Sequence, residues 1–221
     1  MIWLRKHWLR VLTHIGSLVP LSLLLWDFSQ GQLTANPIQY ITQSTGKAAL
    51  VLLVLSLLCT PLNTLFRLRQ VLPLRRPLGL YAFFYVCLHL LTFVWIDYGF
   101  DMGLIWLELS EKLYVIAGFS AFLLLLPLAL TSTKGWMRRL GKRWKQLHRL
   151  VYLAAILAAI HYLWLVKSIT TDPLFYAAAV TLLLILRIRQ VRGWLSNLRR
   201  RLVGRLAVGR GDKVTGDKVT G

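Results

Sequence analysis

Six long apolar runs dominate the sequence and decide what the chain can fold into. Each run carries almost no charge, and about 20 apolar residues at a rise of about 1.5 Å cross a bilayer core of about 30 Å. Lipid cannot satisfy the open edges of a sheet, and no run alternates as the strands of a membrane barrel do. The sequence therefore predicts an all-α, polytopic membrane helical bundle of about six transmembrane helices. The runs are residues 9–26, 46–66, 78–97, 113–131, 147–166 and 173–190.

The charged residues indicate how these helices are oriented. The net charge is +19, and most lysines and arginines gather in alternate loops, whereas most acidic residues lie in the other loops. This is the positive-inside distribution, which predicts that both termini are cytoplasmic. The charge is thus an orientation signal, and secondarily an attraction to anionic membrane lipid, rather than a sign of a nucleic-acid partner. The basic groups are Arg5 to Arg10, Arg67 to Arg76, Lys134 to Arg149 and the residues from Arg187 onward.

The chain divides into a membrane domain at 1–193 and a basic cytoplasmic tail at 194–221. The loops between the apolar runs are too short to fold as a second soluble domain. The tail begins with leucines and arginines at helical spacing, which predicts an amphipathic segment on the inner membrane surface. It ends with the polar repeat GDKVTGDKVTG, for which we expect disorder.

Two histidines lie at matched depth within the third and fifth apolar runs. At about 1.5 Å per residue, His89 is roughly 12 Å from the outer boundary of its helix and His161 about 9 Å. An ionisable residue inside lipid is costly and is a functional candidate by default. Two neutral imidazoles that face each other across a bundle can occupy both axial positions of a haem iron. We therefore predict that His89 and His161 ligate b-type haem in the outer half of the membrane.

The remaining histidines carry weaker signals. His148 precedes His161 in the fifth run and lies roughly 20 Å lower, at the cytoplasmic boundary. It would serve a second, inner haem, although the two imidazoles are about 100–140° apart on a straight helix. His14 is interpreted as an interfacial or helix-packing residue, and His7 as a solvated one. For His89, His148 and His161 the alternative stays open that each is a buried polar side chain bonded to a neighbouring helix.

Other kinds of chemistry lack the residues that they need. The sequence has no phosphate-cradling glycine loop, no metal-type cluster of cysteine and histidine, and no carboxylate inside a run. Cys59 and Cys87 lie within apolar runs, and there is no C-x-x-C-H motif for covalent haem attachment. A bis-imidazole iron has no open coordination position, so we predict electron transfer rather than oxygen chemistry, and we assign no catalytic residue.

Three stretches of the sequence resemble one family of bacterial membrane proteins. RRPLGLYAFFYVCLHLLTF, LALTS and KRWKQLHRLVYLAAILAAIHYLW are similar to parts of the MsrQ (YedZ) family. These are the haem-binding membrane subunits of the MsrPQ methionine sulfoxide reductase system, within the wider ferric-reductase-like transmembrane group. The resemblance covers about residues 5–195. It implies that His89, His148 and His161 are associated with haem b and that FMN is also bound.

The same resemblance implies a role and partners. A subunit of this family lies in the bacterial inner membrane and passes electrons from the quinone pool, or from a cytosolic flavin reductase, to the periplasmic catalytic subunit MsrP. MsrP then repairs oxidised methionines in periplasmic proteins. The chain would accordingly be an electron-transfer subunit of an oxidoreductase complex and not its catalytic subunit.

One position departs from the pattern of the wider group. NADPH oxidases have two histidines on each of two helices, whereas this chain has Arg76 where the third run would need its second histidine. The number of haems, one or two, is therefore left open, and the inner relay is either a haem on His148 or a flavin. Arg75, Arg76 and the Lys134–Lys145 loop are candidates for holding a flavin phosphate or haem propionates by charge-assisted hydrogen bonds. The alternative functions are another membrane cytochrome b, such as a ferric reductase, or a haem-free scaffold or transporter.

Overall fold

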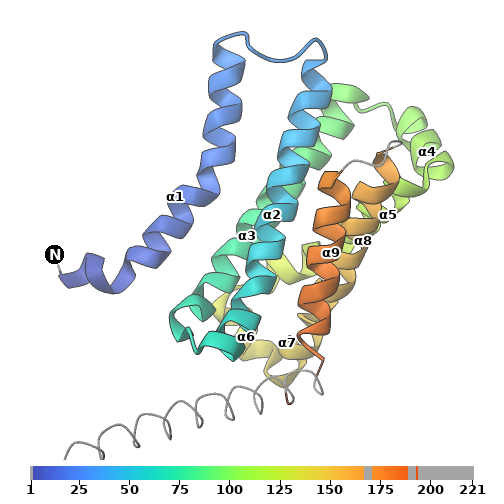
Figure 1. Cartoon of the computed structure of the whole chain (residues 1–221). Helices are drawn as coiled ribbons and strands as arrows, with labels where there is room; N and C mark the ends of the chain where they lie inside the picture. Colours follow the sequence, from blue (N-terminus) through green and yellow to red (C-terminus); the bar gives the residue numbers. More distant parts are fainter. Residues whose placement is uncertain (1, 167–170, 189–192, 194–221) are drawn as a thin grey trace, which may run out of the picture.

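The computed structural model describes residues 2–166, 171–188 and 193, and these residues form helices joined by short connections, with no strand among them (Figure 1). This confirms the predicted all-α class. The elements are α1 (Ile2–Ser29), α2 (Pro37–Phe66), the 3-10 helix η1 (Arg69–Leu74), α3 (Arg75–Leu91), the π-helix η2 (Thr92–Asp97), α4 (Met102–Glu111), α5 (Leu113–Leu130), α6 (Lys134–Leu140), α7 (Lys142–Leu147), α8 (Leu150–Leu165) and α9 (Thr171–Ile185).

Within this described part of the chain, five helical stretches are long and apolar enough to cross a membrane. They are α1, α2, the continuous stretch η1–α3–η2, α5, and the stretch formed by α7 and α8. These five match the first five predicted runs. The sixth run matches α9, which has 15 helical residues because the chain turns at residues 186–188.

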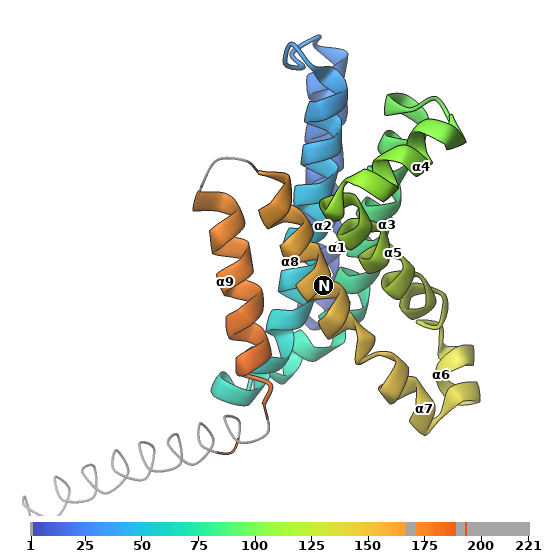
Figure 2. The same cartoon turned by 90° about the vertical axis from the view of Figure 1, so that its right-hand side faces the viewer.

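Two helical hairpins form the centre of the bundle. α2 packs along α3 and α5 packs along α8, whereas far fewer contacts join one hairpin to the other. Small residues allow the close approach within the second hairpin, since Ala154 and Ala155 of α8 have no exposed surface. α9 packs on α8 and α2, and α1 lies at the edge of the bundle beside α2 and α3 (Figures 1 and 2).

Short helices occupy the two connections that lie between α3 and α8. α4 begins after Asp101, whose side chain caps the helix by accepting hydrogen bonds from the N–H groups of Gly103 and Leu104 at 2.8 and 3.1 Å. α6 and α7 are separated by Gly141, whose φ of +51° lies in the left-handed region that favours glycine. Trp106 of α4 is 71% exposed, which is typical of a helix that lies at the membrane interface.

Charge distinguishes the two ends of the bundle. We call the end with α4 and the α1–α2 loop the acidic end, because it carries every carboxylate of the described residues. We call the other end, with η1, α6 and α7, the basic end. The predicted alternation of charge is therefore present in space, while the assignment of the basic end to the cytoplasm stays a prediction. The carboxylates of the acidic end are Asp27, Asp97, Asp101, Glu108, Glu111 and Asp172.

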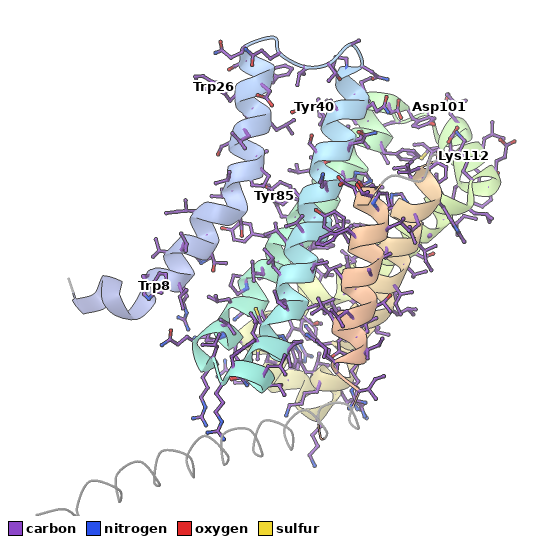
Figure 3. The ribbon with its side chains drawn as sticks, viewed as in Figure 1. Trp8, Trp26, Tyr40, Tyr85, Asp101 and Lys112 are labelled. Carbon is purple, nitrogen blue, oxygen red and sulfur yellow. The ribbon has the colours of Figure 1, made fainter. Side chains whose placement is uncertain are left out.

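Helix α1 bends midway and is held there by a tyrosine of α3. Pro20 lacks a backbone N–H and so interrupts the hydrogen bonding of the helix. The Tyr85 hydroxyl donates to the carbonyl oxygen of Ser17 at 2.8 Å and accepts from the N–H of Leu21 at 3.0 Å. It thus bridges two groups that pair directly in a regular helix. Tyr85 is 1% exposed and points from α3 toward α1 (Figure 3). Its hydroxyl therefore provides a partner for both backbone groups at the bend and attaches α1 to the bundle.

We predict that Tyr85→Phe weakens the attachment of α1. Loss of the hydroxyl leaves a carbonyl and an N–H without their partner in lipid, at a cost of about 1–3 kcal/mol for a buried group. The variant should lower the midpoint of thermal unfolding in detergent and speed proteolysis of the α1–α2 loop. Tyr81→Phe is the matched control, because the Tyr81 hydroxyl bonds to the exposed His14 side chain and to no backbone group of the described residues, and it should have a smaller effect. Wild-type stability of Tyr85→Phe would contradict this role.

Candidate functional site

His89 lies in the half of α3 near the acidic end and is oriented by α2. Its Nδ1 is 2.8 Å from the carbonyl oxygen of Thr42. A carbonyl only accepts, so Nδ1 carries the proton of the ring. One helical turn after Thr42, a Cβ at Gly46 would lie 3.0 Å from Nδ1 and 3.1 Å from Cε1 of the imidazole. The absence of a side chain at Gly46 therefore lets the ring reach this carbonyl.

His161 of α8 has the same arrangement with α5. Its Nδ1 is 2.6 Å from the carbonyl oxygen of Tyr114, and a Cβ at Gly118 would lie 2.7 Å from Nδ1 and 2.9 Å from Cε1. Nδ1 again carries the proton, which leaves the Nε2 lone pair of each neutral ring available. Hydrogen bonding of Nδ1–H to a carbonyl is the usual way in which a protein fixes the tautomer and direction of a metal-binding histidine.

The two imidazoles come from different hairpins and meet between them. Their ring centroids are 6.0 Å apart and their planes are inclined by 85°. In a bis-imidazole metal site, two metal–nitrogen bonds of about 2.0–2.1 Å, with roughly 1 Å from each nitrogen to its ring centre, give a centroid separation of about 6 Å. The nearly perpendicular planes are compatible with ligation, because each ring can rotate about its own metal–nitrogen bond. The separation therefore fits one metal atom between the two rings.

The set of donors fits the iron of a haem better than a bare metal ion. The described residues contain no group of three or more histidine, cysteine, aspartate or glutamate side chains that could hold a metal. Two imidazoles alone leave a bare ion with most of its coordination positions open. In a haem the macrocycle supplies the four equatorial ligands, so that two axial imidazoles complete the coordination. A planar group held by both histidines would lie between the two hairpins, where few contacts join them.

The two histidine sites are related by a constant offset along the chain. Each histidine follows the residue whose carbonyl it contacts by 47 positions. Both hairpins run from the acidic end to the basic end and back, so they form a parallel repeat. Sequence analysis missed this repeat and its four supporting residues, although a glycine at the same distance before each histidine was a usable signal. The pairs Thr42 and Tyr114, Gly46 and Gly118, and His89 and His161 all differ by 72 positions (161 minus 89, for example).

His148 lies apart from this pair, at the basic end. α8 begins at Leu150, and His148 lies in the turn that joins α7 to α8, so the straight-helix geometry assumed for His148 and His161 does not apply. The His148 ring stacks on Trp144 at a centroid distance of 3.9 Å, its Nδ1 is 3.1 Å from the Trp144 carbonyl oxygen, and its Nε2 is 3.5 Å from Oγ of Ser132. By the same offset its counterpart in the first hairpin is Arg76. A role for His148 as an iron ligand stays a prediction.

The two predicted arginines open α3 at the basic end, and both are exposed. The carbonyl oxygen of Arg75 accepts a hydrogen bond from Oγ of Ser56 at 2.9 Å, which fixes the start of α3 against α2. The structure thus brings His89 together with His161, and it places His148 and the two arginines at the basic end, at a different depth. Cofactor binding by Arg75 and Arg76 stays a prediction.

His14 forms a helix-packing contact, one of its two predicted roles. Its Nδ1 is 3.0 Å from the Tyr81 hydroxyl, and the two rings meet edge to face at a centroid distance of 5.6 Å. This contact joins α1 to α3 away from the paired histidines. The side chain of His7 lies outside the part of the structure that is described.

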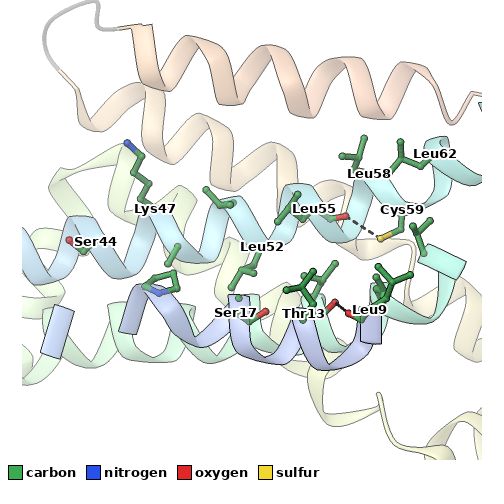
Figure 4. A pocket seen from close by; sticks show the side chains of 18 residues that line it. Leu9, Thr13, Ser17, Ser44, Lys47, Leu52, Leu55, Leu58, Cys59 and Leu62 are labelled. Carbon is green, nitrogen blue, oxygen red and sulfur yellow. Dashed lines mark hydrogen bonds between the residues drawn. The ribbon is translucent and has the colours of Figure 1, made fainter. Parts of the chain in front are cut away.

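A groove of about 610 Å³ lies between α1 and α2 (Figure 4). Its walls are mostly aliphatic and include Leu52 and Leu55 of α2 and Leu9 of α1, and Val71 of η1 contributes near the basic end. Oγ of Ser17 is buried beside this groove and has no hydrogen-bond partner among the described residues. The groove is therefore an apolar space within the membrane region that is separate from the paired histidines.

Comparisons with known proteins agree with this geometry. Residues 45–159 match the family model described as "Ferric reductase like transmembrane component". The chain is also 45% identical over 180 residues to the protein-methionine-sulfoxide reductase heme-binding subunit MsrQ of Rhodospirillum rubrum, an alignment that covers 81% of this chain and 86% of the relative. The chain belongs to the MsrQ family. It is accordingly a multi-pass membrane protein, in agreement with its five long apolar helices.

We predict that replacing a glycine by alanine destabilises this MsrQ-family chain at Gly118 but not at Gly16. Gly118→Ala places a Cβ 2.7 Å from Nδ1 of His161, and displacing this packed ring costs about 1–3 kcal/mol. That exceeds the gain of about 0.8–1.0 kcal/mol that alanine brings within a helix. Gly118→Ala should therefore lower the midpoint of thermal unfolding, and Gly46→Ala should lower it less. Gly16→Ala is the control and should be neutral or stabilising, because nothing lies within 4 Å of its Cβ. A larger loss at Gly16 than at Gly118 would contradict the packing argument.

Proposed function

We propose that this chain binds haem b between His89 and His161 and carries electrons across the inner membrane of a bacterium. The observation that carries the proposal is the pair of imidazoles, each fixed by a helix carbonyl and a glycine, at a centroid separation of 6.0 Å. The name of the Rhodospirillum rubrum relative as a heme-binding subunit supports the same cofactor. Haem supplies a one-electron iron couple, and the protein holds and orients its axial ligands.

The proposed role is electron transfer and not catalysis on a substrate. Imidazoles at both axial positions leave no position for oxygen or another substrate. The hydrogen bonds from Nδ1 to the carbonyls of Thr42 and Tyr114 fix the tautomer of each ring and leave its Nε2 lone pair for a metal. The chain is therefore proposed to be a subunit of an oxidoreductase complex whose partner performs the chemistry.

The proposed acceptor is the catalytic subunit MsrP. The relative's name makes it a subunit of a protein-methionine-sulfoxide reductase, which supports this partner. Both histidines lie in the half of the bundle near the acidic end, so a haem there is closer to a partner on that side. With the basic end in the cytoplasm, the acceptor is periplasmic, and the electrons support repair of oxidised periplasmic proteins.

The proposed electron donor is the quinone pool or a cytosolic flavin reductase. The groove between α1 and α2 supports a quinone, because its aliphatic walls and its volume of about 610 Å³ suit an apolar molecule that diffuses in lipid. The basic end supports a flavin, with FMN held by Arg75, Arg76 and the basic residues of the Lys134–Lys145 segment. His148 is the proposed inner ligand if a second haem is present.

Two alternatives make different predictions. Another membrane cytochrome b, such as a ferric reductase, is favoured by the description of the matching family model, and it would reduce a ferric chelate instead of MsrP. A haem-free scaffold or transporter is not favoured, because such a function does not explain why two imidazoles have the same carbonyl and glycine partners. Direct measurement of haem and of its acceptor separates the three.

We predict that purified full-length protein, produced with haem supplied, has a b-type haem spectrum. His89→Ala and His161→Ala should each remove most of this haem, because one axial ligand is lost. His14→Ala is the control, since His14 is a membrane-helix histidine whose contact is with Tyr81. Pyridine haemochrome assays with protein quantification provide the measurement. A colourless wild-type protein would contradict the proposed function, and full haem content in both variants would contradict the ligand assignment.

We also predict that the reduced protein is reoxidised by MsrP faster than by a ferric chelate. Stopped-flow absorbance of the haem band measures both rates on the same preparation. His148→Ala should keep the haem between His89 and His161, so its rate of reoxidation by MsrP should equal the wild-type rate. Faster reoxidation by the chelate than by MsrP would favour the ferric reductase alternative.

A further inference from the structure

Arg187 places a guanidinium inside the basic-end half of the bundle. It follows α9, yet its Nη1 donates to the Tyr152 hydroxyl at 2.8 Å and its Nη2 donates to the carbonyl oxygen of Leu57 at 2.5 Å. The guanidinium carbon also lies 5.0 Å from the centre of the Tyr152 ring. The Nε–H of the same side chain is buried and has no acceptor among the described residues. Arg187 therefore links α9 to α2 and α8 while its buried Nε–H has no partner among the described residues.

A second arginine lies beside this group. The Arg75 carbonyl bonds to Ser56, which immediately precedes Leu57 on α2, so the start of α3 and the end of α9 meet α2 at consecutive residues. Arg75 is exposed, whereas Arg187 is partly buried. The pair is thus open to the basic-end surface on one side and packed inside the bundle on the other.

No carboxylate of the described residues can balance these two charges. All six carboxylates in this part of the chain lie at the acidic end, on the far side of the membrane region. A guanidinium stays protonated in proteins, so the charge of Arg187 cannot be removed by loss of a proton. A partly buried charge without a counter-charge in lipid is costly and marks a functional position by default. The described side chains therefore supply no counter-charge to these two arginines, and a bound anion would supply one.

We propose that Arg187 and Arg75 bind a phosphate group at the basic end. A phosphate monoester carries a charge of about −1.5 to −2 near pH 7, which matches two guanidinium groups. Arginine is also the side chain whose planar set of N–H donors suits phosphate oxygens. The unused Nε of Arg187 is the donor on the buried side, and Arg75 is the donor on the surface side. Two sources carry a phosphate, the monoester of a flavin or the singly charged diester of a lipid headgroup, and the first source rests on the proposed function.

The test compares ligands that differ only in phosphate. Full-length protein in phosphatidylcholine nanodiscs is titrated with FMN and with riboflavin, and native mass spectrometry counts bound phosphatidylglycerol when this lipid is added. For a flavin site, FMN should bind at least about tenfold more tightly than riboflavin, as expected for charge-assisted hydrogen bonds. For a lipid site, bound phosphatidylglycerol should be detected while FMN and riboflavin bind equally weakly.

In either case Arg187→Gln and Arg75→Gln should abolish the phosphate-dependent binding, and Arg187→Lys should restore part of it. Arg69→Gln is the matched control, because Arg69 is an exposed arginine of η1 at the same end. If Arg187→Gln does not accumulate, Arg75→Gln alone tests the phosphate site, because the Arg75 side chain is exposed and its replacement should not disturb folding. The inference is overturned if wild-type protein binds neither phosphate or if both glutamine variants bind as the wild type does. Haem content is recorded throughout, because its absence from the wild type would contradict the proposed function and not the phosphate site.

Discussion

Two hydrogen bonds from imidazole N–H groups to helix carbonyls determine the rest of the candidate site. Inside lipid no water can accept from Nδ1 of His89 or His161, and an unsatisfied buried donor costs about 1–3 kcal/mol. A helix carbonyl already accepts the N–H of the residue one turn later, so a second donor must approach past that residue. A side chain there would block the approach, and both positions are glycine, at Gly46 and Gly118. The requirement for satisfied polar groups thus fixes the tautomer, the ring position and the glycine together.

The parallel repeat explains how the two rings meet. Each hairpin contains its own histidine, carbonyl and glycine, so each ring is oriented by contacts within its own hairpin. Packing of one hairpin against the other then sets the separation of the rings, which is 6.0 Å between centroids. α1 and α9 lie outside the repeat and support it, α1 through the bridge from Tyr85 and α9 through Arg187. The pair of imidazoles is therefore a property of the interface between hairpins.

The membrane helices and the depth of the histidines could be predicted from the sequence, because hydropathy and position along a helix follow from the order of residues alone. The apolar runs gave the membrane helices, and residue counting gave the matched depth of His89 and His161. The carbonyl partners could not be predicted in the same way, because every residue has a carbonyl and glycine is common in membrane helices. The bridge from Tyr85 was equally hidden, since its meaning depends on a bend at Pro20 in another helix. The turn at His148 could not be predicted either, because no glycine or proline lies at that position.

The basic end is where the repeat loses its symmetry, and the loss has an electrostatic consequence. The offset that relates His89 to His161 relates Arg76 to His148, so one of the two equivalent positions has an arginine instead of an imidazole. Arg187 adds a further positive charge from α9, which has no counterpart in the repeat. Neutral imidazoles bring no charge to the acidic-end site, whereas fixed guanidinium groups stabilise added negative charge on any group bound beside them. The same repeat therefore provides two neutral, equivalently oriented imidazoles near one surface and a cationic, asymmetric environment near the other.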